Sequence, residues 1–380
     1  MKSQRIYLDY NATTPVDPLV LKALIQALES DQGNPSSIHF DGQQSRRLLT
    51  QSRHSIAQFF NVPPHELIFT SGGTEGAALL LQGVMQRQPT GHLITSNVEH
   101  SCVYQTAKEL EKKGYASTFL NSGPFGAISA RQVEEAIRSD TRLITLMAVN
   151  NETGVKTDVS EIAQVAYRHG IPFVVDGVAW LGKEIFTLSK GISAIFFSGH
   201  KIHAPKGIGV CVCRSSLKLM PLFVGGEQEY QRRAGTENLA GIVALAKAIQ
   251  QVEQTQQESI QWMQHLRDKF EQDLQKQLSN VVINGEGARI CNTSNLSFLD
   301  VDGETLLMML DQAGISASHG SACSSGALEP SRILLQMGLG LARARSSIRF
   351  SFGKTTTPAE TQEAVQIIVQ VVNRLKKLKA

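Results

Sequence analysis

Short apolar runs recur along the first half of the chain and alternate with longer stretches of helical pattern. Six of these runs are nearly continuously apolar, as strands covered on both faces are, and they lie at residues 66–70, 92–96, 143–149, 172–176, 194–198 and 208–213. Helical patterns separate several of them, at about 73–87, 101–113, 130–139 and 159–169. Repeated strand–helix–strand units predict a mostly parallel sheet in an α/β layer fold. The last two runs leave no room for a helix between them, so we expect them to pair as an antiparallel hairpin.

The pattern changes after Glu237, where a long helical stretch rich in Gln, Glu and Lys covers residues 239–279. A smaller α+β region follows, with strands expected near 293–299 and 347–352 and a last helix from about Pro358. A chain of 380 residues exceeds what one hydrophobic core usually supports. We therefore predict two lobes that share a long helix instead of a flexible linker.

The composition argues against several classes of function. The chain has 37 Lys and Arg against 34 Asp and Glu, a formal charge of +3 that is too small and too scattered to indicate nucleic-acid binding. No stretch approaches the ~18 continuous apolar residues of a membrane span, and the first residues lack a secretory pattern. Five cysteines without a Cys-x-x-Cys pair match neither a disulfide framework nor a zinc site. We therefore expect a cytoplasmic protein without a metal centre.

The segment from Thr70 to Gly76 is the first candidate for ligand binding. Glycines permit a tight turn at the end of an expected strand, and a helix then begins with its N–H groups directed at that turn. Such a helix terminus binds phosphate through its unpaired amides and its dipole, although the segment matches neither common nucleotide-binding fingerprint. The alternative is an ordinary helix start capped by Ser71 or Thr74.

Charged residues also follow two of the apolar runs directly. Lys201 and Lys206 come after residues 194–198, and a buried lysine with a lowered pKa becomes a nucleophile able to form a Schiff base. Their spacing alone does not choose between the two lysines. Asp176 ends the run 172–176, where an aspartate can pair with the protonated ring nitrogen of pyridoxal phosphate (PLP). The alternatives are a solvated surface turn for the lysines and a helix cap for the aspartate.

Cys323 lies in a segment of Gly, Ser and Ala, residues 318–326, whereas three other cysteines have apolar, strand-like neighbours. Exposure makes Cys323 the best candidate nucleophile, with His319 nearby to favour its thiolate. The alternative is a free surface thiol of no consequence. An arginine within a strand suits bidentate capture of a substrate carboxylate. Polar residues of this kind stand at or near strand and loop ends, namely His100, Asn151, Thr236 and Arg349.

Taken together, these segments resemble cysteine desulfurases of the NifS/IscS type, which are fold-type I PLP enzymes of α/β class. The resemblance runs nearly end to end. It implies a large PLP-binding domain at residues 14–257 and a smaller domain, residues 1–13 and 258–380, that carries the cysteine loop. The motifs behind it, in order, are YLDYNATT from Tyr7, GNPSSIH from Gly33, SGGTEG from Ser71, NVEH from Asn97, VNNETG from Val149, VDG from Val175, SGHK from Ser198, RAGTEN from Arg233, SACSSG from Ser321 and SSIRFS from Ser346.

The resemblance implies a role for each matching residue. Lys201, and not Lys206, would carry PLP and move protons at the substrate Cα. Asp176 would pair with the ring nitrogen, while His100 would stack on the ring and assist proton transfer. The remaining cofactor contacts would come from Gly73, Thr74, Asn151, Ser198 and His200, and from Thr236 of the second subunit of a homodimer. The substrate contacts would come from Asn34, Asn151 and Arg349.

The implied reaction is the conversion of L-cysteine to L-alanine. Cys323 would attack the substrate sulfur and become a persulfide, which would pass its sulfur to a protein acceptor such as an iron–sulfur scaffold. Two residues depart from the family pattern: Ala179 stands where a glutamine usually donates to the PLP phenolate oxygen, and His319 replaces a small polar residue. Losing one such donor could cost ~1–3 kcal/mol in cofactor positioning.

Other functions remain as alternatives. The chain could be a selenocysteine lyase or another class V PLP enzyme, although an aminotransferase would have no need of the thiol of Cys323. It could also be a degenerate homologue that only binds partners, a reading that Ala179 alone favours. Such a copy would be expected to lose Lys201, Asp176 or Cys323 first, and all three are present.

Overall fold

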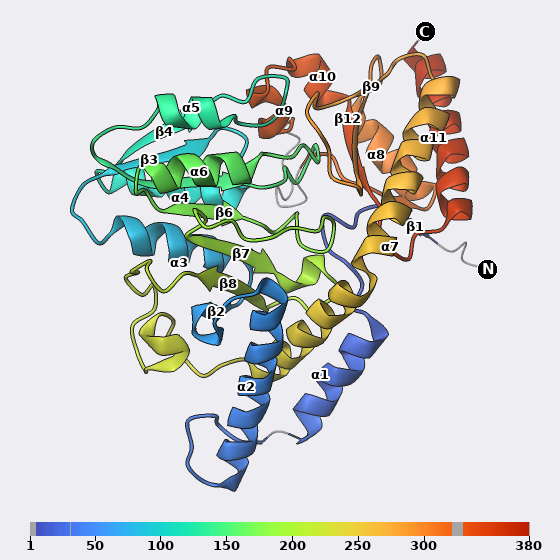
Figure 1. The fold of residues 1–380 in the computed structure, drawn as a ribbon. Helices are drawn as coiled ribbons and strands as arrows, with labels where there is room; N and C mark the ends of the chain where they lie inside the picture. The colour runs from blue at the N-terminus through green and yellow to red at the C-terminus, as the bar shows by residue number, and fades with distance from the viewer. Residues whose placement is uncertain (1–4, 31, 321–329, 380) are drawn as a thin grey trace.

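A seven-stranded sheet forms the centre of the larger lobe in the computed structural model, which describes residues 5–30, 32–320 and 330–379 (Figure 1). The strand order is β2-β8-β7-β6-β5-β3-β4, and β8 runs antiparallel to both of its neighbours while the other adjacent pairs are parallel. The mostly parallel α/β sheet is therefore confirmed. Its strands are β2 (Leu67–Thr70), β3 (His92–Ser96), β4 (Ala116–Leu120), β5 (Thr141–Met147), β6 (Phe173–Asp176), β7 (Ala194–Ser198) and β8 (Gly209–Cys213).

Both faces of this sheet are covered by helices, which explains why its strands are continuously apolar. Successive side chains of a strand point to opposite faces: Phe196 packs with the helices of one layer, and Phe197 packs with those of the other. The first layer contains α3 (Gly73–Met85) and α4 (Ser101–Lys112). The second contains α2 (Phe40–Phe60), α5 (Ala130–Glu135), α6 (Val159–Arg168) and the first half of α7 (Leu239–Gln277).

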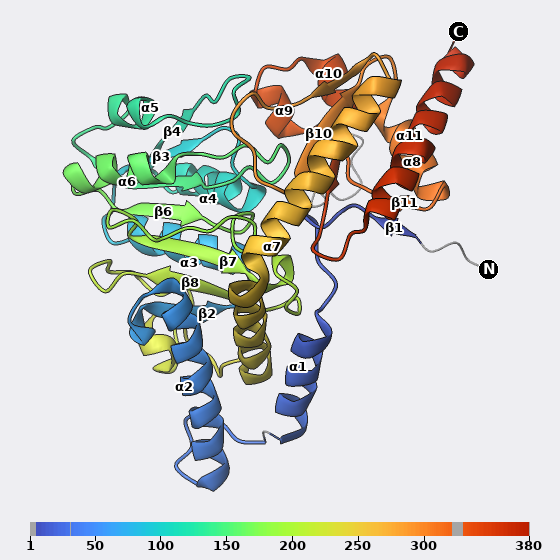
Figure 2. The same ribbon diagram turned by 45° about the vertical axis from the view of Figure 1, so that its right-hand side comes forward.

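The smaller lobe is built on a second, antiparallel sheet of order β12-β10-β9 (Figure 2). A short parallel pair, β1 with β11, joins the N-terminal segment to this lobe. The strands of the lobe are β1 (Ile6–Tyr7), β9 (Val281–Ile283), β10 (Thr293–Phe298), β11 (Ile315–Ser316) and β12 (Ser347–Ser351). Its helices are α8 (Gly303–Gln312), α9 (Arg332–Gln336), α10 (Leu341–Arg345) and α11 (Pro358–Lys379).

Helix α7 enters the cores of both lobes. Ile249 and Met263 pack into the core of the larger lobe, while Leu266 and Phe270 pack into that of the smaller one. One helix therefore connects the two cores, as the unbroken helical pattern of residues 239–279 predicts. The domain limits at residues 13/14 and 257/258 stay a prediction.

Helices α1 (Pro18–Ser30) and α2 pack against α7 and project beyond the sheet (Figure 1). The hairpin of β7 and β8 is confirmed, with Ser198 opposite Gly209 at the end where the connecting loop joins the two strands. Strand β4 was not predicted, because it is a half-buried edge strand with serine and threonine among its five residues. None of the described helices is both long and apolar enough to cross a membrane. Three short 3-10 turns complete the described structure: η1 (Pro64–Glu66), η2 (Gly199–Lys201) and η3 (Gln228–Gln231).

Candidate active site

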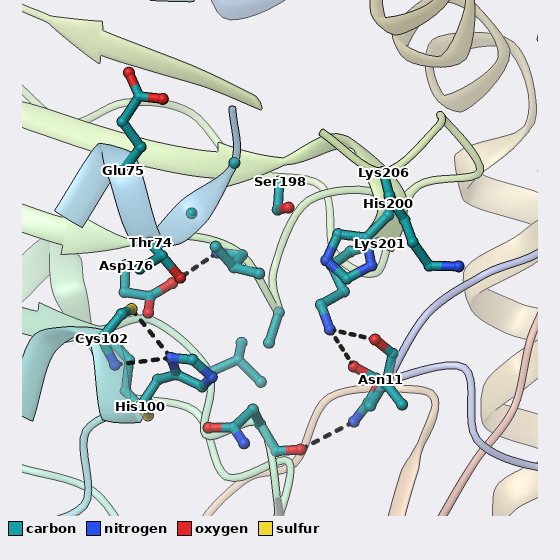
Figure 3. Close-up of a pocket in the computed structure, with 18 of the residues that line it drawn as sticks. Asn11, Thr74, Glu75, His100, Cys102, Asp176, Ser198, His200, Lys201 and Lys206 are labelled. Carbon is teal, nitrogen blue, oxygen red and sulfur yellow. Dashed lines mark hydrogen bonds between the residues drawn. The ribbon is translucent and has the colours of Figure 1, made fainter. Parts of the chain in front are cut away.

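A cavity of about 440 Å³ lies where the carboxyl ends of the central strands meet the smaller lobe (Figure 3). Ligands of open α/β sheets bind at this edge. Asn34 and Thr236 are exposed and do not line the cavity, and Cys323 lies outside the described residues. The other nine predicted site residues line it together: Gly73, Thr74, His100, Asn151, Asp176, Ser198, His200, Lys201 and Arg349.

Lys201 is held in the cavity wall by the backbone of the N-terminal segment. It ends the η2 turn that follows β7, and its Nζ donates to the carbonyl oxygens of Asn11 at 2.6 Å and Ala12 at 2.8 Å. Lys206 also lines the cavity, but it is exposed. The geometry therefore distinguishes two lysines that spacing alone left equivalent, and the half-buried Lys201 is the better placed nucleophile.

Asp176 ends β6 and is only 5% exposed. Its Oδ1 accepts the backbone N–H of Val178 at 2.9 Å. Burial raises the pKa of Asp176 to about 6, although the Val178 amide and the charge of Lys201 both act to lower it. A buried carboxylate of this kind is stabilised by a cation placed in the cavity, and a protonated ring nitrogen would supply one.

His100 caps the N-terminus of α4. Its Nδ1 accepts the backbone N–H of Cys102 at 3.2 Å and lies 3.0 Å from the Cys102 Sγ. Because Nδ1 is an acceptor, the proton of the neutral ring resides on Nε2. Burial, together with the charge of Lys201, lowers the pKa of His100 to about 4. The imidazole is therefore uncharged at neutral pH and able to stack on a ring or to accept a proton.

The turn between β2 and α3 has the features of a phosphate site. Gly72 has a φ of +151°, a conformation that glycine adopts without strain. No side chain caps the N-terminus of α3 at Gly72, so its first N–H groups are available at the cavity. Gly73 is needed for space, because a Cβ there would lie 2.9 Å from Val178 Cγ2. Ser198 and His200 border the same part of the cavity (Figure 3).

Arg349 brings a buried guanidinium from β12 of the smaller lobe. It is 2% exposed and pairs with Asp9 through Nη2 and Oδ1 at 2.9 Å, while its Nη1 donates to the carbonyl oxygen of Asn151 at 3.0 Å. Within the described residues, Arg349 Nε and Asn151 Oδ1 are both buried without a hydrogen-bond partner. An unpaired donor and an unpaired acceptor in a cavity wall indicate a polar ligand.

The structure adds four residues that sequence reasoning assigned no role. Asp9 and Asn11 belong to the YLDYNATT motif, which was used only to support the resemblance, and Cys102 gave no signal beyond being a cysteine. Lys183 gave none at all, yet it is a buried lysine of the cavity wall. Ala179 also lines the cavity, and its methyl group cannot replace the hydrogen bond that a glutamine there would donate.

The chain on both sides of residues 321–329 is attached next to the cavity. On one side, Ser318 Oγ donates to Asp9 Oδ1 at 2.9 Å. On the other, the Ser331 hydroxyl donates to the buried carboxylate of Glu152, and Arg332 donates to the carbonyl oxygens of Asn97 and Glu99. His319 lies 3.1 Å, through Nε2, from the Arg345 carbonyl oxygen. The two ends of the cysteine segment are therefore fixed beside the strand ends that form the cavity.

The described cysteines are poor nucleophiles. Cys211, Cys213 and Cys291 are buried, and burial raises the pKa of each thiol, to about 11 for Cys213 and about 12 for Cys291. Cys102 lines the cavity, but burial raises the pKa of its thiol as well, and the nearby carboxylates act in the same direction. None of these four thiols forms an appreciable thiolate at neutral pH.

Comparison with known proteins agrees with this geometry. The family model for aminotransferase class-V matches residues 6–364. Cysteine desulfurase 2 of Trichormus variabilis is 41% identical over 376 residues, which cover 98% of this chain and 94% of the relative. The chain belongs to the class V aminotransferase family, among its cysteine desulfurases. Cysteine desulfurase IscS of Dictyoglomus turgidum is 37% identical over 379 residues, covering 99% and 96% of the two chains.

Solved structures show that the relationship extends to the fold. A NifS-like protein superimposes with a TM-score of 0.91 at 30% identity and covers 98% of this class V chain and 100% of its own. SspA, solved in complex with cysteine, has a TM-score of 0.81 at 32% identity and covers 92% of this chain and 99% of its own. The fold-type I architecture implied by the sequence is thereby confirmed.

Proposed function

We propose that this protein is a PLP-dependent cysteine desulfurase that converts L-cysteine to L-alanine and collects the sulfur on Cys323. One observation carries the proposal: Lys201, Asp176 and Arg349 face a common cavity. A reactive amine, a buried carboxylate and a buried guanidinium are the groups that a PLP enzyme needs for its cofactor and for an amino-acid substrate. The structure of the related SspA with cysteine supports the choice of substrate.

The residues of the cavity wall fit PLP. Asp176 is buried and would pair with the ring nitrogen, and the uncapped N-terminus of α3 offers N–H groups and a positive dipole end to a phosphate. Thr74, Ser198 and His200 border this end of the cavity and would complete the phosphate contacts. When bound, PLP withdraws electrons from the substrate Cα, which makes the Cα proton acidic.

Four residues would then act on the substrate. Arg349 and Asn151 have unpaired buried atoms, Nε and Oδ1, with which to orient the carboxylate and the amino group. Lys201 would hold the cofactor, and its Nζ, once free, would accept the Cα proton. His100 is uncharged, so its ring face would assist this transfer without repelling the protonated Lys201.

Cys323 performs the sulfur transfer. Its thiolate forms a bond to the substrate sulfur while the Cβ–S bond breaks, and the electron pair of that bond stays on the carbon side. Protonation of this carbon, together with return of a proton from Lys201 to Cα, would yield alanine, and Cys323 would retain the sulfur as a persulfide. The attachments of Ser318 and Arg332 support this role, because they fix the chain on both sides of the segment beside the cavity.

The proposal includes a homodimer in which Thr236 is contributed to the cavity of the second subunit. Thr236 is exposed and lies outside the cavity of its own chain, as Asn34 does. Large apolar side chains are exposed on α1 and in the segment after it, including Leu28 at 63%, Ile38 at 88% and Phe40 at 71%. An apolar surface of this kind is expected to be covered by a second copy.

The sulfur would pass from Cys323 to a protein acceptor, such as an iron–sulfur scaffold, in the cytoplasm. The described cysteines form no disulfide, which suits a reducing compartment. Because Cys323 would have to deliver sulfur outside the cavity, its segment would need to move during the reaction cycle.

The deciding experiment is incubation of the purified protein with L-cysteine and dithiothreitol, with alanine and sulfide measured together. Equal amounts of both products are expected, and Cys323→Ser should form neither while its visible spectrum still responds to cysteine. Cys213→Ala is the matched control, because Cys213 is buried in β8 away from the cavity, and it should retain activity. Alanine formation by Cys323→Ser near the parent rate would overturn the assignment.

A further inference from the structure

Lys183 is a second buried lysine in the wall of the candidate active site. It lies in the segment between β6 and β7, is 6% exposed, and lines the same cavity as Lys201. Its Nζ donates to Asn11 Oδ1 at 3.3 Å. Lys183 takes part in none of the ion pairs formed by the described residues, so its charge is balanced by dipoles alone. A lysine is seldom buried in this way without a task.

Asn11 connects the two lysines. Its backbone oxygen accepts from Lys201 at 2.6 Å, and its side-chain oxygen accepts from Lys183 at 3.3 Å and from Asn292 Nδ2 at 3.1 Å. Its own amide donates to Thr293 Oγ1 at 2.8 Å, which fixes its orientation. Both amines therefore contact a single residue that is itself held in place, and the separation between them is determined by the fold.

Two ammonium groups held this close disfavour each other's charge. Burial, together with the charge of Lys201, lowers the pKa of Lys183 to about 7, whereas Cys291 acts in the opposite direction. The lysines also border a second cavity of about 50 Å³ on the side of α1 and α7. The titratable and charged groups coupled to Lys183 or lining the smaller cavity with it are Lys201, Arg349, Cys291, Tyr10, His200, His203, Asp17 and Lys354. The wall of the larger cavity adds Glu75, His100, Cys102, Asp176 and Lys206.

Of these groups, Asp17 forms an ion pair with Lys354 at 2.8 Å, which leaves it little influence on Lys183. Cys291 donates its Sγ–H to the Lys183 carbonyl oxygen at 3.1 Å, so it is present as the neutral thiol. His100, His200 and His203 have lowered pKa values because they are buried, and they are uncharged near neutral pH. The charges that act to lower the pKa of Lys183 are those of Lys201 and Arg349.

We propose that Lys183 is a positioning residue for Lys201: its ammonium, held by Asn11 in the same cavity wall, favours the uncharged amine of Lys201. This inference rests on the proposed function, in which Lys201 carries PLP. When two coupled amines share one site, their protons leave in two steps that belong to the pair, and an ammonium on one disfavours the charge of the other. Lys201 needs a neutral amine to capture PLP and to accept the Cα proton, and this form is favoured whenever Lys183 carries the charge.

The test is a pH titration of the visible absorption of the PLP-loaded full-length protein, which reports protonation of the cofactor nitrogen bonded to Lys201. Lys183→Met removes the neighbouring charge with little change in shape. Its apparent pKa should therefore lie above that of the parent by about one unit, the effect of one nearby charge in a partly buried site. Lys206→Met is the matched control, since Lys206 lines the same cavity but is exposed, and its titration should follow that of the parent.

Lys183→Arg distinguishes the effect of the charge at this position from the effect of side-chain packing. Its guanidinium stays protonated at every accessible pH, so the apparent pKa should lie at or below the parent value. A Lys183→Met protein that is less stable but titrates like the parent would overturn the proposal, because packing alone would then explain the residue. Should Lys183→Met fail to fold, Lys183→Arg decides: an apparent pKa above the parent value would also overturn it. A parent protein without visible absorption would refute the proposed function itself.

Discussion

Asp9 and Arg349 form a buried ion pair between residues at opposite ends of the chain, with 2.9 Å between Oδ1 and Nη2. The same Asp9 oxygen accepts the hydroxyl of Ser318, which lies just before the cysteine segment. Asp9 therefore contacts both the arginine that we assign to the substrate and the chain that leads to Cys323. A single carboxylate therefore holds both Arg349 and Ser318.

Replacing Asp9 should destabilise the fold more than a surface change of the same kind. Asp9→Asn leaves the guanidinium of Arg349 buried without its counter-ion, which should lower the free energy of unfolding by about 3 kcal/mol. Urea unfolding would measure the loss. Asp311→Asn is the control, since Asp311 pairs with Arg5 at an exposed site and should cost less than about 1 kcal/mol. Equal losses of unfolding free energy in the two variants would show that the buried ion pair stabilises the fold no more than the exposed one.

Asp176 makes the cofactor-free protein sensitive to pH. Its folded pKa of about 6 exceeds the ordinary aspartate value of 3.8, so the folded state binds the proton more tightly than the unfolded state does. Stability should therefore fall as pH rises from about 4 to about 6, by roughly 3 kcal/mol at most. Asp176→Asn should remove this dependence and retain PLP poorly. Urea unfolding of the two apoproteins at pH 4.5 and pH 7 tests it, and the same pH slope in both would contradict the assignment.

Of Lys201 and Lys206, only Lys201 should attach the cofactor. Lys201→Ala should lose the visible absorption of bound PLP, because no amine remains at the contacts to Asn11 and Ala12. Lys206→Ala should keep it, since Lys206 is exposed at the rim. Borohydride reduction followed by peptide mapping would locate the linkage in the parent. A label on Lys206, or on no lysine, would show that the cofactor is held differently.

Much of the larger lobe could be predicted from the sequence because its strands are covered on both faces and are therefore apolar throughout. Asp176, Ser198 and Lys201 were found for the same reason, since each ends or follows such a strand. Strand β4 escaped because an edge strand needs no apolar run. The pairing of β1 with β11 joins Ile6 to Ile315, and no local pattern indicates a partner so distant in the chain.

The missed site residues share one physical property: their roles depend on tertiary contacts. Lys183 follows a tryptophan, a leucine and a glycine, a setting that does not differ from a loop at the surface, and only the fold shows that it is buried. Asn11 acts through its backbone oxygen as well as its side chain, which no sequence motif reveals. Resemblance alone indicated Asn34, whereas Thr236 also stood out as a polar residue near a loop end; both are exposed in the single chain.

Helix α1 provides the test of the proposed dimer. Leu28 is 63% exposed on this projecting helix, so Leu28→Glu should not disturb the fold of one chain but should place a charge on the surface expected to meet the second subunit. We expect the sedimentation coefficient of the variant to fall toward that of a monomer at micromolar concentration. Its retention of PLP during dialysis should fall as well, because Thr236 of the second subunit would no longer reach the cavity.

Leu378 is the matched control for this substitution. It is 75% exposed on α11 of the smaller lobe, so Leu378→Glu adds the same charge to an equally accessible apolar position on another element. This variant should sediment and retain PLP as the parent does. A parent protein that sediments as a fully PLP-loaded monomer would refute the shared site. A Leu28→Glu protein that remains a dimer would instead place the interface away from α1, because a buried, unpaired glutamate in that surface would cost several kcal/mol.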